Sequence, residues 1–353
     1  MRVPRPAIAP LVDSLFERGA SDLLLSAGAP PMLRVDGALT PAAAEPITAE
    51  ELAGLVDELL SAAQRATLHE RGAVDFSLGW DRHGRLRGNA FHQRGSVALA
   101  LRAIAHSIPG LAELGLPAAV ERLVDLPQGL ILITGPAGSG KSTTQAAMID
   151  ALNRSRALHV ITIEDPIEYL HRHQRCLIDQ REVGVDTPSF AEALRSVLRE
   201  DPDVLLVGEM RDLESIRMAL SIAETGHLVI GTLHTSDASQ AITRVVDAFP
   251  AEQQQQVRVQ LSLSLAAVLH QQLLPRREGG RVAAVEVLIA TPAVRSLVRE
   301  NKLGQLRNVI ATSAREGMQT LESSLSALVA SGQVEHAVAL SRSLHPAEVR
   351  AAG

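Results

Sequence analysis

The chain has 353 residues, 46% apolar and 21% charged, with a formal net charge of −6 and a pI of about 6.1. This balance is typical of a soluble globular protein, and the length predicts two domains. No apolar run approaches the roughly 18 residues of a membrane span, and the single cysteine excludes an internal disulfide and a four-thiolate zinc site. With five Phe, one Trp and one Tyr, the acidic chain has few groups for binding nucleic acid, and none is expected as a partner. We expect a cytoplasmic protein.

The first part of the chain, residues 1–108, mixes helical and strand patterns. Thr48 and Glu51 have the spacing of a helix capping box, and two alternating segments near Gly95 have the spacing of a β-hairpin. These patterns predict a small α+β domain. Its expected helices and strands are Ile8 to Arg18, Leu23 to Leu25, Thr48 to Leu60, Leu86 to Phe91 and Val97 to Ile104.

Prolines and glycines interrupt the next segment, and we predict a linker over residues 109–127. After it come four apolar, strand-like runs, GLILITG, LHVITIED, DPDVLLVGE and GHLVIGTLH, separated by helical segments. Continuous apolar strands of this kind belong in a parallel sheet covered on both faces. Residues 128–353 are therefore expected to form an α/β domain. From about Pro250 to the end the pattern is helical, with little strand signal beyond Val282 to Ile289.

The sequence GPAGSGKS at 135–142 matches the phosphate-loop pattern G-x-x-x-x-G-K-[ST], with a strand before it and a helical segment after it. The glycines let backbone N–H groups converge on phosphate oxygens, and the following helix directs its positive end at the same anion. Lys141 is expected to contact the β and γ phosphates and Ser142 to ligate Mg²⁺. A glycine-rich turn without a ligand would leave the lysine and the flanking elements unexplained. The expected phosphate-binding residues are Gly135, Pro136, Ala137, Gly138, Ser139, Gly140, Lys141, Ser142 and Thr143.

Two other apolar strands end in carboxylates. Glu209 follows Val204 to Val207, and an acid at the tip of a buried parallel strand can hold Mg²⁺; a salt-bridged or helix-capping glutamate is the alternative. The other strand leads into Glu164, Asp165 and Glu168, one of which is a candidate base for an attacking water. Glu164 or Asp165 can instead cap the next helix.

Two histidines, His227 and His234, flank the apolar strand Leu228 to Thr232. Either alone is more typical of a structural histidine. At the two ends of a strand in a nucleotide-binding sheet, they are candidates for sensing the γ-phosphate.

Four motifs resemble those of one protein family, and they occur along this chain in the same order as in that family. GPAGSGKSTT resembles a Walker A motif, IEDPIEYLH an aspartate box, LREDPDVLLVGEMRD a Walker B motif and TGHLVIGTLHTSDA a histidine box. The family is the type II/IV secretion ATPases and, within it, the PilT-like retraction motors of type IV pili. The resemblance extends over about residues 8 to 335, including ASDLLLSAGAPPMLRVDG before the motifs and GRVAAVEVLIATPAVRSLVRENK after them.

This resemblance implies a hexameric ring whose subunits join a PAS-like N-terminal domain to a RecA-like ATPase domain with a helical C-terminal region. ATP and Mg²⁺ are the implied ligands. Glu168 matches the family's catalytic glutamate and Glu209 its Walker B acid. His227 and His234 match the histidine-box residues. Arginines of the N-terminal domain reach the γ-phosphate in related ATPases, and the candidates here are Arg85, Arg87 and Arg102.

The implied function is pilus retraction by a Mg-ATPase located peripherally at the inner membrane. Its implied partners are a membrane-embedded platform protein and, in some systems, a paralogous pilus ATPase. The sequence departs from the family at Ala137, Leu24 and Ser296, the last lying in AVRSLVRE, where the family has AIRNLIRE. That change keeps an accessory paralogue as an alternative, beside a related secretion ATPase, a non-hydrolysing regulatory subunit and a nucleic-acid translocase.

Overall fold

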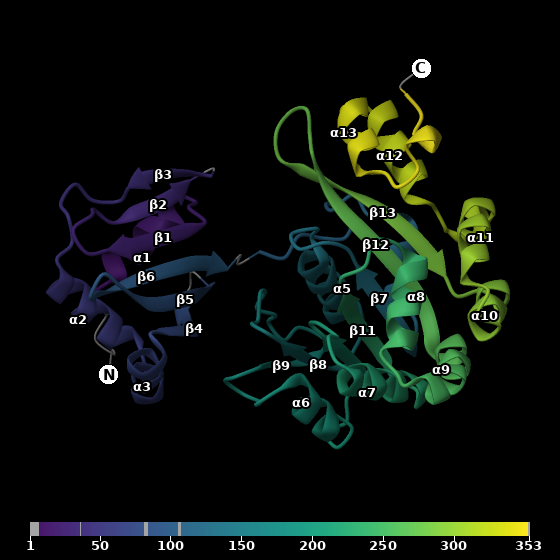
Figure 1. Cartoon of the computed structure of the whole chain (residues 1–353), viewed down its shortest axis with the longest axis horizontal. Coiled ribbons are helices and arrows are strands. Elements are labelled where there is room, and N and C mark those ends of the chain that lie inside the picture. Colours follow the sequence, from purple (N-terminus) through teal and green to yellow (C-terminus); the bar gives the residue numbers. More distant parts are fainter. Residues whose placement is uncertain (1–6, 36, 81–83, 105–106, 352–353) are drawn as a thin grey trace. The chain divides into compact units, whose positions relative to one another are not determined.

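The computed structural model describes residues 7–35, 37–80, 84–104 and 107–351. The chain divides into two units (Figure 1). The first, here called the N-terminal domain, comprises Met1–Ser107 with Glu168–Leu170, and the second, the α/β domain, comprises Ile108–Ile167 with His171–Gly353. In the described residues, every helix is too short or too polar to cross a membrane.

The N-terminal domain contains a six-stranded antiparallel sheet in the order β3-β2-β1-β6-β5-β4. Its strands are β1 (Asp22–Ser26), β2 (Met32–Val35), β3 (Ala38–Pro41), β4 (Ala73–Trp80), β5 (Gly84–Gln93) and β6 (Ser96–Ile104). Its helices are α1 (Ala9–Glu17), α2 (Ala49–Leu59) and α3 (Ala62–Arg71). The predicted hairpin is confirmed, because β5 and β6 pair in antiparallel register. So is the capping box of Thr48 and Glu51 at the start of α2.

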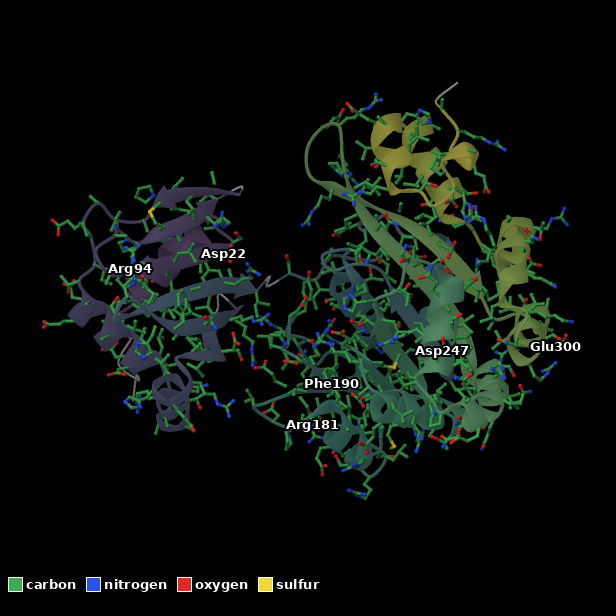
Figure 2. All side chains as sticks on the ribbon, viewed as in Figure 1. Asp22, Arg94, Arg181, Phe190, Asp247 and Glu300 are labelled. Carbon is green, nitrogen blue, oxygen red and sulfur yellow. The ribbon has the colours of Figure 1, made fainter. Side chains whose placement is uncertain are left out.

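The two faces of this sheet differ because successive side chains of a strand point to opposite sides. Leu86 and Leu101 lie in the apolar core beneath the helices. Arg87 and Arg102, on the other face, are exposed and directly opposite each other in the β5–β6 register. Asp22 on β1 (Figure 2) accepts a hydrogen bond from Arg102 Nε at 2.8 Å. Like charges directly opposite each other on neighbouring strands are unfavourable, so the Arg87–Arg102 pair lowers the stability of the sheet.

The α/β domain contains a seven-stranded sheet in the order β13-β12-β7-β11-β10-β8-β9, parallel except for β13. Its strands are β7 (Gly129–Thr134), β8 (His159–Glu164), β9 (Leu177–Glu182), β10 (Val204–Val207), β11 (Leu228–Leu233), β12 (Leu265–Pro275) and β13 (Arg281–Ile289). The four apolar runs predicted as strands correspond to β7, β8, β10 and β11.

Helices cover both faces of this sheet, as the apolar strands predict. On β7, Ile131 and Ile133 pack with α4 (Ala118–Val124) and α5 (Lys141–Ser155). Leu130 and Leu132 belong to the cluster on the other face. The helices of that second face are α6 (Phe190–Val197), α7 (Leu213–Glu224), α8 (Ala238–Asp247), α9 (Ala251–Ser264), α10 (Pro292–Arg299) and α11 (Leu306–Thr312).

Two segments differ from expectation. Residues 109–127, expected to be a linker, contribute Leu111, Val120 and Leu123 to the core of the α/β domain. The expectation of helix for residues 265–275 is wrong, because β12 pairs along its length with β7 and β13. The apolar run in this segment is compatible with a buried strand as well as with a helix. Its pairing with the neighbouring strands determines that it is a strand.

The helical C-terminal region is present, together with the strand expected at Val282 to Ile289. Helices α12 (Leu321–Ala330) and α13 (His336–Arg342) lie beside the β12–β13 hairpin (Figure 1). Leu321 and Leu325 of α12 pack there on Val282 and Ala284. Short 3₁₀ turns occupy Leu303–Gln305, Ala314–Glu316 and Pro346–Glu348.

The close fit of Phe76 over Gly88 offers a test of the N-terminal domain. A Cβ on Gly88 would lie 2.2 Å from the ring of Phe76, so we expect Gly88→Ala to destabilise this domain by about 1–3 kcal/mol through overpacking. Urea unfolding followed by the fluorescence of Trp80, the single tryptophan, measures this domain alone. Gly79→Ala, on the same sheet with open space around it, is the matched control. An equal effect of the two substitutions would contradict the packing argument.

Candidate nucleotide site

Parallel pairing brings the ends of four strands to one edge of the α/β sheet. The carboxyl ends of β7, β11, β10 and β8 are in register, and each leads into residues predicted to be functional. The phosphate loop follows β7, His234 follows β11, Glu209 follows β10, and Glu164, Asp165 and Glu168 end or follow β8. Ligands of open α/β sheets bind at this edge.

The phosphate loop has the backbone geometry that its glycines predict. Gly135, Gly138 and Gly140 have φ values of 143°, 73° and 89°. Residues with a side chain rarely adopt such positive φ values, whereas glycine does so readily. Lys141, only 8% exposed, donates from Nζ to the carbonyls of Gly135 and Pro136, each at 2.9 Å. Among the described residues, the buried Ser139 Oγ has no hydrogen-bond partner. Because polar atoms are rarely buried without a partner, this loop fits an anion that completes it.

Glu209 and His234 lie in contact at the same edge. Glu209 Oε1 is 3.2 Å from His234 Nε2 and 2.6 Å from Arg211 Nε. Burial acts to raise the pKa of Glu209, and hydrogen bonding and charge from Arg211, with His234, outweigh it, so the pKa is lowered. The carboxyl is thus ionised at neutral pH. Glu209 is therefore in an ion pair, which is the alternative considered from the sequence. It also follows the end of β10, the position expected of a Walker B acid.

The three carboxylates near the end of β8 have different surroundings. Glu164 accepts hydrogen bonds from Thr162 Oγ1 at 2.6 Å and from Gln180 Nε2 at 3.1 Å. Asp165 and Glu168 are exposed in the residues that follow, and Glu168 groups with the N-terminal domain rather than with the α/β domain. Helix capping by Glu164 or Asp165 does not occur, because the next element is strand β9.

The structure does not bring His227 to this edge. It immediately precedes β11, at the amino end of the strand, and its Nδ1 lies 3.1 Å from the carbonyl of Ile222. Six strand residues rise about 20 Å, so His227 and His234 lie at opposite edges of the sheet. Arg87 and Arg102 belong to the N-terminal domain, as does Arg85, which donates to Ser77 Oγ at 2.6 Å; their nucleotide contacts stay a prediction.

Sequence analysis missed three buried polar residues on β12 and β13, the two strands that extend the sheet beyond β7. On β12, His270 Nδ1 lies 3.3 Å from Thr134 Oγ1, and the amide of Gln271 contacts the phosphate loop. On β13, Glu286 accepts a hydrogen bond from the N–H of Ala238, the first residue of α8, at 2.8 Å. The available signal was the polar HQQ in an otherwise apolar run.

Burial shifts the pKa values of two of these groups in opposite directions. Burial lowers the pKa of His270 to about 4. For Glu286, burial raises the pKa to about 7, and the negative charges of Asp237 and Glu322 add to the rise. The hydrogen bond from the N–H of Ala238 lowers the pKa and offsets part of this rise. His270 is therefore neutral at physiological pH, whereas Glu286 titrates there.

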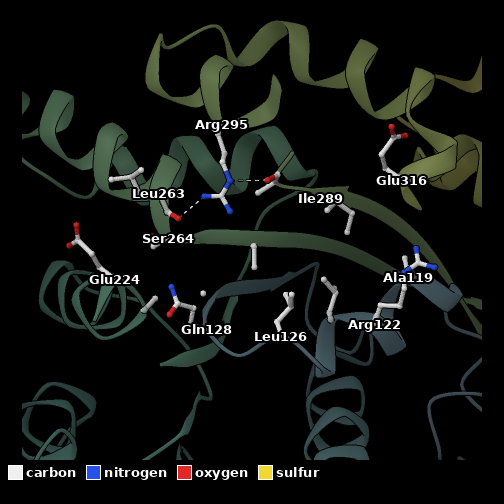
Figure 3. Close-up of a pocket in the computed structure, with 15 residues that line it drawn as sticks. Ala119, Arg122, Leu126, Gln128, Glu224, Leu263, Ser264, Ile289, Arg295 and Glu316 are labelled. Carbon is white, nitrogen blue, oxygen red and sulfur yellow. Dashed lines mark hydrogen bonds between the residues drawn. The ribbon is translucent and has the colours of Figure 1, made fainter. Parts of the chain in front are cut away.

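A pocket of about 540 Å³ lies elsewhere in the α/β domain (Figure 3). Gly129 and Ser264 line it, close to the amino ends of β7 and β12. Arg295 lies at its edge and donates to the carbonyls of Ala290, at 2.9 Å, and Ser262, at 2.7 Å. This pocket is at the sheet edge opposite the phosphate loop, so it is separate from the nucleotide site.

Comparisons with known proteins agree with this geometry. Residues 7–277 match the family described as type II/IV secretion system protein. The chain is 50% identical over 318 residues to the type IV pilus retraction ATPase PilT of Pseudomonas aeruginosa, covering 90% of this chain and 92% of that protein. It is 47% identical over 305 residues to a twitching motility protein of Neisseria gonorrhoeae, covering 86% and 82%.

The fold matches a crystal structure of the pilus retraction motor PilT with bound ADP, with a TM-score of 0.91 at 48% identity over 97% of this chain and 98% of that one. The chain therefore belongs to the type II/IV secretion system protein family. It is an ATPase of that family, with an N-terminal domain, an α/β domain that carries the phosphate loop, and a helical C-terminal region.

The raised pKa of Glu286 predicts a pH-dependent stability. A folded-state pKa of about 7 against an ordinary 4.5 gives stability that is complete below pH 4.5 and is lost as the pH rises through 7. We expect Glu286→Gln, which mimics the protonated form, to gain about 3 kcal/mol relative to wild type between pH 4.5 and pH 8. Urea unfolding followed by circular dichroism at both pH values measures the difference. His270 is present in both proteins and cancels; a difference independent of pH would contradict the prediction.

Proposed function

We propose that this protein is an ATPase that powers the retraction of type IV pili. The observation that carries the proposal is a complete phosphate loop beside the Glu209–His234 pair, in a chain that aligns with a pilus retraction ATPase over 90% of its length. The ADP bound by the similar retraction motor supports ATP as the substrate.

The phosphate loop and the start of α5 supply the binding groups for ATP. On binding, Lys141 leaves its two carbonyl contacts and contacts the β and γ phosphates instead. Its ammonium group neutralises part of their negative charge. Glycines at 135, 138 and 140 leave the backbone N–H groups accessible, and α5 directs its positive end at the anion.

The donor set also fits Mg²⁺, which prefers oxygen ligands and is commonly held by one carboxylate beside the substrate phosphates. Ser142 and Glu209 are the residues that would hold it. When bound, the ion neutralises charge on the β and γ phosphates. His234 and Arg211 keep Glu209 ionised and fix one of its oxygens.

Glu168 is the proposed general base. Among the carboxylates that end or follow β8, Glu168 is the one that matches the family's catalytic glutamate, and its side chain is exposed. It accepts a proton from the water that attacks the γ-phosphate. Contacts of Arg87 and Arg102 with the nucleotide, and a role for His227, stay predictions from the resemblance.

The proposed working form is a homohexamer at the cytoplasmic face of the inner membrane. Its proposed partner is the platform protein of the pilus machine, with a paralogous pilus ATPase as an additional subunit in some systems. The 47% identity to a twitching motility protein supports this setting. Arg87 lies opposite Arg102 in the β5–β6 register, and this basic pair suits an anionic ligand such as a nucleotide.

The base assignment predicts separable binding and chemistry. We expect Glu168→Gln to bind ATP as wild type does and to hydrolyse it about a hundredfold more slowly, because the amide cannot accept the proton. Phosphate release and nucleotide titration with the purified protein measure the two quantities. Glu164→Gln is the matched control and is expected to keep most of its turnover. Normal turnover in Glu168→Gln would remove the assignment.

The cellular role predicts a defined phenotype. A strain lacking this chain should carry many pili and show no twitching, and wild type should restore motility whereas Lys141→Ala, which loses the phosphate contact, should not. Electron microscopy and twitching assays provide the readouts. Cells without pili would instead indicate an assembly motor, and unchanged pili and motility an accessory paralogue or another secretion system.

A further inference from the structure

The phosphate loop is held from outside by strand β12, at a residue that no sequence motif includes. In the β7–β12 register, His270 is paired with Thr134, the last residue before the loop. The next residue, Gln271, therefore lies beside Gly135. Its side chain is 3% exposed and is on the opposite face of the strand from His270.

Both ends of the Gln271 amide are used. Nε2 donates to the carbonyl of Ser139 at 2.9 Å, and Oε1 accepts from Thr144 Oγ1 at 2.8 Å. A carbonyl can only accept and a hydroxyl can donate, so the orientation of the amide is set by its partners. Gln271 thus joins the loop to the first turn of α5, and its two partners lie on either side of residues 140–143.

Two glycines of the motif permit this approach. A Cβ on Gly135 would lie 2.2 Å from the backbone oxygen of Gln271, and a Cβ on Gly140 would lie 2.8 Å from its Nε2. A side chain at Gly135 would force β12 to move, and a side chain at Gly140 would displace the Gln271 amide. Glycine at 135 and 140 therefore serves the contact with β12 as well as the approach of phosphate.

The hydrogen bond to Ser139 has a directional consequence. A peptide group is planar and trans, so its C=O and the following N–H point in opposite directions. Because Gln271 holds the carbonyl of Ser139 toward β12, the N–H of Gly140 is directed away from β12. Without that bond, rotation of the peptide can turn the carbonyl oxygen toward the anion, where it repels phosphate.

We propose that Gln271 is a positioning residue for nucleotide phosphates: its amide fixes the peptide between Ser139 and Gly140 so that the Gly140 N–H serves the phosphates. This inference rests on the proposed function, because it assumes that ATP occupies the loop. Gln271 acts through the loop and does not itself contact the nucleotide.

The test compares the steady-state kinetics of full-length variants. Gln271→Leu removes both hydrogen bonds, and Gln271→Glu keeps the acceptor for Thr144 while losing the donor to Ser139. Both should raise the KM for ATP by at least about tenfold, the effect of losing one buried hydrogen bond. The kcat should stay within about threefold, since the Gly140 N–H that Gln271 positions would bind the phosphates of substrate and transition state alike.

Thr144→Val and Gln272→Leu complete the set. Thr144→Val leaves the donation to Ser139 available and should keep KM within about threefold of wild type. Gln272, the neighbour on β12 whose amide contacts His270, is the matched control and should leave both constants unchanged. The thermal stability of each variant without nucleotide separates a loss of fold from a loss of phosphate binding. Nucleotide-induced stabilisation gives the affinity of any variant too unstable for kinetics.

The failures are distinguishable. A wild-type KM in Gln271→Leu, or a fall in kcat at unchanged KM, would overturn the role of Gln271 while leaving the ATPase function standing. A KM in Thr144→Val as high as in Gln271→Leu would overturn the assignment to the Ser139 carbonyl. If wild type and Gln272→Leu also failed to bind ATP, the proposed function itself would be contradicted.

Discussion

The nucleotide site depends on the parallel pairing of β7, β11, β10 and β8 within one sheet. Parallel strands deliver their carboxyl ends to a single edge, so a phosphate loop, an ionised glutamate and a histidine meet there although the chain between them is long. Glu209 and His234 are in contact only because β10 and β11 are neighbours in register. The same pairing sends His227 to the far edge. The sheet thus selects which of the candidate side chains can act together.

A second constraint is the burial of polar groups around the loop. His270, Gln271 and Glu286 are each at most 4% exposed, and an unpaired polar group at such a position is costly. Each has a partner on the elements that carry the site: Thr134 at the end of β7, the phosphate loop itself, and the start of α8. Strands β12 and β13 therefore act as more than cover for the sheet. They fix the loop that receives phosphate and the helix that follows His234.

The N-terminal domain follows a different physical rule. Its antiparallel sheet buries one face beneath three helices, and the other, here called the polar face, carries the charged side chains of Asp22, Arg87 and Arg102. Arg87 and Arg102 share the polar face at adjacent positions, and Asp22 neutralises only part of their charge. Such a face is poorly explained by stability alone. It is well suited to an anionic ligand.

Local pattern determined much of this protein. The phosphate loop, the four apolar strands, the capping box at Thr48 and the family itself follow from residues close together in sequence, because helix caps, strand runs and glycine-rich turns are short-range features. Tertiary structure alone decided the rest. Residues 265–275 became a strand because β7 and β13 pair with them, and Gln271 reached a loop 132 positions away. The sequence placed His227 and His234 at the two ends of one strand, and the parallel pairing of β11 with β7 and β10 decided that the His234 end lies at the edge of the phosphate loop.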